Sequence, residues 1–126
     1  MTPFARIRIK WGSGAVSAAL DDTPTARALV AALPLKSSAS TWGDEVYFDV
    51  PVEARLEPGA RQIVEPGTVS FWTEGGALAL PFGRTPISDD ASPKLVSRCN
   101  VLGRIDGDCR ELGKVRSGDM MTVSKE

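Results

Sequence analysis

Several short segments of this chain alternate between apolar and polar residues, the pattern of a strand with one buried face. In residues 6–12, apolar side chains alternate with three basic ones. Residues 42–52 alternate in the same way and place Glu45 and Tyr47 on the more polar face. The same pattern predicts further strands at residues 15–20, 68–73, 77–82, 95–105 and within 117–126.

One segment has the 3- and 4-residue apolar spacing of an amphipathic helix, which is carried by Ala26, Leu29, Val30 and Leu33. Thr23 and Pro24 are typical of an N-cap and a first helical position. Pro34 is expected to end the helix. A shorter helical turn is predicted in residues 107–115.

Turns rich in Gly and Pro separate the predicted strands. Residues 36–41 are interpreted as a polar loop, and Gly103 as a bulge or bend in its strand. Seven or eight short strands with frequent turns favour a mainly β fold, either a closed barrel or a sandwich. A lone helix beside a barrel is suited to cover one open end.

Length and composition are those of one ordinary globular domain, residues 1–126, with 42% hydrophobic and 25% charged residues. The net charge of −1 gives no reason to expect nucleic acid or a membrane as a partner. No apolar run is long enough for a signal peptide or a membrane span. We therefore expect a soluble, cytoplasmic protein.

The chain contains no histidine and two cysteines. Without histidine, Ser/His/Asp and Cys/His nucleophiles and the usual zinc sites are excluded, and we predict no metal or other cofactor. If residues 99–109 form a hairpin turning at Asp106 and Gly107, Cys109 lies opposite Arg104 and beyond disulfide reach of Cys99. Two reduced thiols are predicted.

The order of five segments resembles a known family. The segments PTARALVAALP, TWGDEVYF, PGTVSFWTEGGALALPFGRTPIS, VLGRIDGD and SGDMMTV look like those of the small bacterial and archaeal cyclophilin-like proteins, which have no assigned activity. The resemblance covers nearly the whole chain. It implies a closed cyclophilin-like β-barrel of about eight strands, with one or two short helices capping its ends.

True cyclophilins catalyse prolyl isomerisation, and the resemblance also shows where this chain departs from them. Their catalytic arginine donates a hydrogen bond to the prolyl nitrogen, whereas Glu45 and Tyr47 stand where that arginine is expected here. An ionised carboxylate cannot donate. Arg55 and Arg84 are other arginines, but their spacing does not argue for the role. The sequence therefore argues against prolyl isomerase activity.

A groove on the outer face of the barrel is the expected place for a ligand, because apolar walls with a few polar groups suit a small molecule or a peptide. Arg84 is suited to hold a carboxylate through two parallel hydrogen bonds. Each candidate also has an ordinary structural role as its alternative. The aromatic residues could pack in the core, Glu45 could be solvated or salt-bridged on its strand, and Arg84 could simply flank a turn. The candidate ligand-binding residues are Trp42, Glu45, Tyr47, Trp72, Phe82, Arg84, Thr85 and Ser88.

The sequence thus predicts a binding module for a small anionic ligand or a peptide. Two alternatives stay open. One is an enzyme, either a degenerate prolyl isomerase or an acid–base catalyst that uses Glu45. The other is an accessory subunit of an amide or lactam hydrolase, since cyclophilin-like barrels resemble domains of such assemblies. An exposed sheet edge would also support a homodimer.

Overall fold

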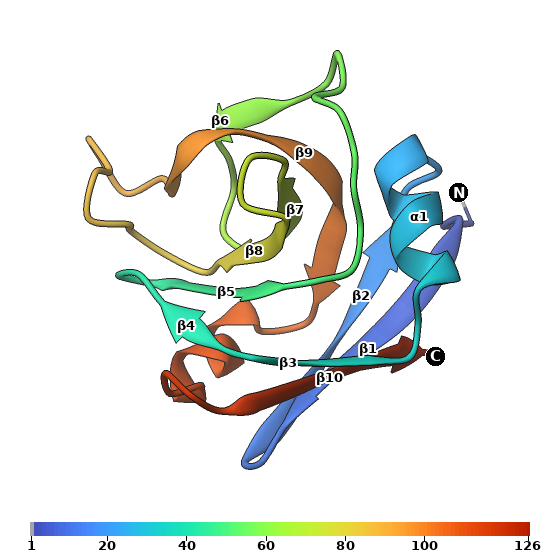
Figure 1. Cartoon of the computed structure of the whole chain (residues 1–126). Helices are drawn as coiled ribbons and strands as arrows, with labels where there is room; N and C mark the ends of the chain where they lie inside the picture. Colours follow the sequence, from blue (N-terminus) through green and yellow to red (C-terminus); the bar gives the residue numbers. More distant parts are fainter. Residues whose placement is uncertain (1) are drawn as a thin grey trace.

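A curled sheet of ten strands makes up most of the molecule in the computed structural model, which describes residues 2–126 (Figure 1). The strands follow the order β3-β10-β1-β2-β9-β7-β8-β5-β4, and β6 pairs with β9 outside this path. The strands are β1 (Ala5–Trp11), β2 (Gly14–Leu20), β3 (Leu35–Ser38), β4 (Ser40–Thr41), β5 (Glu45–Asp49), β6 (Arg61–Ile63), β7 (Thr68–Trp72), β8 (Ala77–Pro81), β9 (Lys94–Asp106) and β10 (Met120–Lys125).

The two end strands of this order, β3 and β4, are consecutive in the chain and only Ala39 separates them. Ala39 is anchored to the start of β10, because its N–H donates to the Asp119 carbonyl and its own carbonyl accepts from Gly118, both at 2.8 Å. The predicted mainly β class is confirmed. The predicted closed barrel of eight strands is not: there are ten strands, and the pairings in residues 2–126 form an open path.

The inner face of the sheet forms the main core, as the alternation along β1 and β5 predicts. On β1, Ile7 and Ile9 are fully buried, while Arg8 between them is exposed, as are the flanking basic residues of the strand. On β5, Val46 and Phe48 are buried in the same core. The apolar period therefore separates two faces along each strand, and the outer face of β5 carries Glu45 and Tyr47.

Two short helical segments, α1 (Pro24–Ala31) and the 3₁₀ helix η1 (Cys109–Lys114), accompany the sheet. The side chain of Thr23 accepts a hydrogen bond from the Ala26 N–H, which confirms the predicted N-cap. The helix ends at Ala31, two residues before the predicted Leu33. No helix in residues 2–126 is long and apolar enough to cross a bilayer.

The prediction of a polar loop at residues 36–41 was wrong, because β3 and β4 occupy it. Both strands are short and carry Ser, Thr and Lys, so the alternation that marks a half-buried strand is missing. Their backbones pair with β10 on one side and with β5 on the other. Apart from Leu35, which is buried in the main core, these strands are therefore defined by backbone pairing and not by an apolar face.

Both cysteines are free, as predicted, although the hairpin from which this was argued does not form. Cys99 lies in β9 opposite Arg61 of β6. Cys109 begins η1 and so does not lie on a strand opposite Arg104. The chain turns at Gly107, where φ is 75°, and the Asp108 side chain caps the 3₁₀ helix that follows.

Strand β9 joins the two halves of the sheet, pairing with β6 at its start, with β7 in the middle and with β2 at its end. Figure 1 shows it curving around β7 and β8. The register against β7 shifts beside Gly103, which confirms the predicted irregularity. A Cβ atom at position 103 would lie 2.0 Å from the Ala19 carbonyl oxygen, so only glycine permits this approach of β2 and β9.

Replacing Gly103 with alanine is expected to lower the free energy of unfolding by about 1–3 kcal/mol or more, because a backbone group must move to admit the methyl group. Urea denaturation of the wild type and Gly103→Ala measures this as a lower midpoint. Gly59→Ala is the matched control, since a Cβ there meets nothing within 4 Å. Equal midpoints for Gly103→Ala and Gly59→Ala would contradict the role of Gly103.

Candidate functional site

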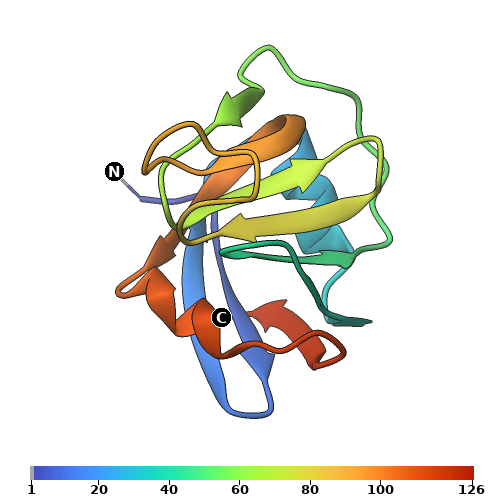
Figure 2. The ribbon, with the colours of Figure 1, turned by 90° about the vertical axis from the view of Figure 1, so that its left-hand side faces the viewer.

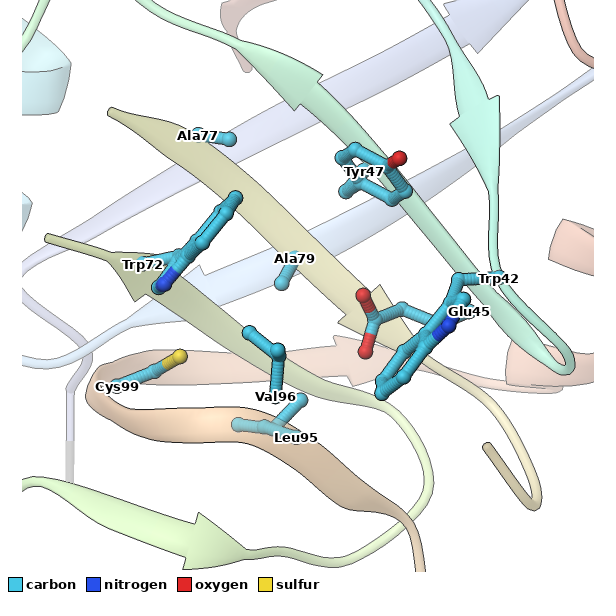
Figure 3. A pocket seen from close by; sticks show the side chains of 9 residues that line it. All are labelled: Trp42, Glu45, Tyr47, Trp72, Ala77, Ala79, Leu95, Val96 and Cys99. Carbon is cyan, nitrogen blue, oxygen red and sulfur yellow. The ribbon is translucent and has the colours of Figure 1, made fainter. Parts of the chain in front are cut away.

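A cavity of about 180 Å³ lies on the outer face of the sheet, over β5, β8 and β7. Figure 2 shows these three strands side by side, and Figure 3 shows the cavity from close by. It opens to solvent on one side and is mostly apolar. Its lining residues are Trp42, Glu45, Tyr47, Trp72, Ala77, Ala79, Leu95, Val96 and Cys99.

The floor of the cavity exists because β8 presents alanines where its neighbours present large side chains. Ala79 lies opposite Tyr47 of β5, and Ala77 lies opposite Trp72 of β7. Side chains on directly opposed strand positions touch, so a small residue between aromatic neighbours leaves a hollow. On the other face of β8, Leu78 and Leu80 fill the main core.

The wall of the cavity comes from the first half of β9, which folds back over the outer face. Leu95 and Cys99 are buried there with Val64 in a second, smaller hydrophobic cluster that includes Ala79. Val96 is 51% exposed and lies at the mouth of the cavity. The wall thus consists of uncharged side chains and covers one side of the floor.

Glu45 is the only carboxylic acid that lines the cavity, and it is 6% exposed. Its Oε1 atom is buried without a hydrogen-bond partner in residues 2–126. Burial in apolar surroundings disfavours the charged form and raises the pKa of Glu45 to about 7. A carboxyl group that changes charge near neutral pH therefore points into an apolar hollow.

Trp72 is held in place by the turn that follows β7. Its ring lies directly on Gly75, where a Cβ atom would come within 2.1 Å of the indole Cε3 atom. The Gly76 N–H donates to the Trp72 carbonyl oxygen at 2.9 Å and closes the turn. The indole Nε1 is buried and, in the described part of the chain, has no acceptor. The cavity region thus contains one unpaired donor and one unpaired acceptor.

Trp42 and Glu45 flank the tight turn between β4 and β5, in which the Trp42 N–H donates to the Glu45 carbonyl oxygen at 3.0 Å. Gly43 occupies this turn with φ of 59°. Asp44 connects the turn to the segment after β8: its N–H donates to the Arg84 carbonyl and its carbonyl accepts from Phe82, both at 2.8 Å. Residues 82–88 therefore support the turn from behind.

The structure brings four of the eight predicted site residues together at the cavity: Trp42, Glu45, Tyr47 and Trp72. The other four, Phe82, Arg84, Thr85 and Ser88, do not line it.

These four residues form the supporting segment. Phe82 packs on the main core, and the guanidinium of Arg84 donates to the Ser88 carbonyl at 3.4 Å. The Ser88 hydroxyl oxygen accepts from the backbone N–H groups of Thr85 and Lys94, at 3.0 and 3.1 Å. Their polar groups are thus used to fold the loop.

Five lining residues were not predicted from the sequence: Ala77, Ala79, Leu95, Val96 and Cys99. For the two alanines a signal existed, since the segment ALALP alternates small and large residues. For the three residues of β9 there was no local signal, because their place at the cavity depends on the path of β9 around the sheet.

The electrostatic environment of the cavity is negative. Burial, followed by the charges of Glu45 and Glu74, raises the pKa of the Cys99 thiol to about 12. No lysine or arginine is among the lining residues. Cys99 is therefore a protonated, unreactive thiol at neutral pH, and the ionisable group to consider is Glu45.

The fold and the cavity define a small, mainly β protein with a pocket on the outside of its curled sheet. The chain belongs to the cyclophilin-like family, whose model matches residues 5–124. It is similar to a hypothetical protein of Archaeoglobus fulgidus, known from its solution structure. The two share 38% sequence identity over 97% of this chain and 95% of that one, with a TM-score of 0.82. No curated protein matches the chain.

The raised pKa of Glu45 makes stability depend on pH. Between the unfolded value of 4.5 and the folded value of about 7, the folded protein holds a proton that the unfolded chain has lost. The stability that the folded protein has with Glu45 protonated is fully present below pH 4.5 and is lost as pH rises through 7. We expect Glu45→Gln to be within about 1 kcal/mol of the wild type at pH 5 and to be more stable by about 3 kcal/mol at pH 8, from 1.36 kcal/mol per pKa unit.

Urea midpoints of both proteins at pH 5, 6, 7 and 8 provide the measurement. Asp49→Asn is the matched control, because it removes an exposed carboxylate from the same strand. We expect this control to follow the wild-type dependence on pH. Parallel profiles for the wild type and Glu45→Gln would show that the carboxyl group is not desolvated.

Proposed function

We propose that the protein is a binding module whose outer-face cavity takes up a small molecule, or one side chain of a peptide, with an apolar body and a polar group. The observation that carries this proposal is the unpartnered Oε1 of Glu45 in an apolar hollow. A buried polar atom without a partner destabilises the folded protein. A ligand that supplies the missing hydrogen bond recovers that free energy on binding.

The size of the cavity supports a small ligand. An engineered apolar cavity of about 150 Å³ takes up benzene, and this cavity measures about 180 Å³. Small-molecule sites are typically apolar hollows with a few polar groups that fix orientation. Here the Glu45 carboxyl group, the Tyr47 hydroxyl and the indole nitrogens of Trp42 and Trp72 are among the polar groups of the lining side chains. A folded peptide segment is too large, although one side chain is not.

The charge of the cavity changes the expected ligand. The anionic ligand was predicted from Arg84, but Arg84 is outside the lining and its guanidinium contacts Ser88. An anion in the cavity would be repelled by ionised Glu45 and by Glu74 on the turn after β7, with no lining cation to offset them. A neutral or cationic ligand fits these charges better.

Acid–base catalysis by Glu45 is the second candidate function, and its pKa of about 7 supports it. Prolyl isomerisation has less support, because no lysine or arginine lines the cavity to donate to a prolyl nitrogen. The hydrolase partner and the homodimer stay predictions of the sequence.

One experiment separates the binding module from the acid–base enzyme. Each ligand is incubated with the protein and the products are followed by NMR. Turnover that Glu45→Gln abolishes identifies an enzyme.

Filling the cavity should abolish binding. Ala79→Leu places a larger side chain on the floor, where alanine is 4% exposed between Tyr47 and Ser70. We expect the ligands found by an NMR fragment screen of the wild type to lose at least tenfold in affinity for Ala79→Leu.

Ala15→Leu is the matched control, because it makes the same exchange on the outer face of β2, away from the cavity. It should bind the fragments as the wild type does. Fragments that bind Ala79→Leu and the wild type equally, or a screen that finds no binder at the cavity, would overturn the proposed function.

A further inference from the structure

We infer that the cavity selects small alkylated ammonium ions, held between aromatic side chains with Glu45 as the counter-ion. This inference rests on the proposed function and names the ligand class for the same cavity. It covers a free amine as well as a methylated lysine side chain, because both present the same chemical group.

Three aromatic side chains from three parts of the fold surround the cavity: Trp42 from the turn before β5, Tyr47 from β5 and Trp72 from the end of β7. Figure 3 shows the two indole rings on opposite sides, with Ala79 and the Glu45 carboxylate between them. Aromatic faces attract cations, and groups of aromatic rings are a known way to bind alkylated ammonium ions. The cavity has this composition.

Glu45 supplies what a set of aromatic rings alone lacks. Its carboxylate has a free, buried oxygen, which can accept a hydrogen bond from an ammonium N–H or lie against an alkylated one. A purely apolar ligand would leave this oxygen unpaired, and an anion would add a second negative charge in an apolar site. Of the three kinds of ligand, a cation is the one that stabilises the buried Glu45 carboxylate through its charge.

The rest of the cavity suits the alkyl substituents of such an ion. Ala77 and Ala79 form the floor, and Leu95 and Val96 form the wall, so that methyl groups would contact apolar surface. Trp72 is already fixed in place by its contact with Gly75. A site that is formed before binding loses little conformational entropy when the ligand enters.

Binding of a cation should be linked to ionisation of Glu45. The titratable groups that face the cavity are Glu45, Tyr47 and Cys99, with Glu74 on the adjoining turn. The pKa of Cys99 is raised to about 12 and that of Glu45 to about 7, so Glu45 is the group that changes charge between pH 6 and 8. A cation prefers the ionised form and should bind about tenfold more tightly at pH 8 than at pH 6.

A pair of isosteric ligands tests the inference. N,N-dimethylethanolammonium and 3-methylbutan-1-ol have the same heavy-atom skeleton, but only the first is charged. With the wild type at pH 8, NMR titration should show at least tenfold tighter binding of the ammonium ion. Glu45→Gln should remove that preference, because the charge that favours the ammonium ion is gone. Equal or tighter binding of the alcohol by the wild type would overturn the inference.

Further measurements cover the aromatic contribution and the source of the ligand. Trp42→Leu keeps Glu45 in place and should weaken binding of the ammonium ion at least fivefold more than binding of the alcohol. An equal loss of affinity for both ligands counts against the aromatic contacts. A peptide with dimethyl-lysine, compared with its lysine form, identifies a protein side chain as the source if it binds more tightly than the free amine. Tighter binding of the free amine identifies a small molecule.

The outcomes also separate this inference from the proposed function. If neither the ammonium ion nor the dimethyl-lysine peptide binds, but other fragments bind and Ala79→Leu excludes them, the inference fails and the binding function stands. If no compound binds at the cavity, both fail. Tighter ammonium binding at pH 6 than at pH 8 also counts against Glu45 as the counter-ion.

Discussion

The close approach of β2 and β9 at Gly103 is the contact on which the rest of the molecule depends. It lets one long strand pair with β2 at its end and with β7 and β6 before it, so that two groups of strands become one curled sheet. The same path carries Leu95 and Cys99 over the outer face of β8. The absence of a Cβ atom at position 103 therefore permits both the joining of the sheet and the path of β9 that gives the cavity its wall.

The site uses the second face of strands whose first face builds the core. Along β5, β8 and β7, every other residue points inwards and packs with the helix residues Ala26 and Leu29 in the main core. The residues between them would normally meet water. Here β9 covers them in part, and a carboxyl group that sequence pattern places on a solvated face becomes desolvated. The function proposed for Glu45 follows from this second, incomplete layer.

Much of the fold could be predicted from local pattern, because alternation and capping are encoded in neighbouring residues. The strand containing Glu45 and Tyr47, the N-cap Thr23 and the irregularity at Gly103 were all predicted this way. The strands β3 and β4 were not, since they are short and, apart from the buried Leu35, are held by backbone pairing instead of an apolar face. The cavity wall depends on contacts between distant segments, and the burial of Glu45 depends on that wall. Arg84 stood next to promising residues in sequence, yet its guanidinium is turned to Ser88.

The direct connection of β3 to β4 through Ala39 has a consequence for the behaviour of the protein at high concentration. The end strands β3 and β4 are four and two residues long, rich in hydroxyl side chains, and continuous with each other. Long, flat, apolar edges are the ones that recruit further chains into cross-β aggregates. In the described residues, the two ends of this sheet are short polar strands. Edge-to-edge pairing between copies of the protein is therefore disfavoured there.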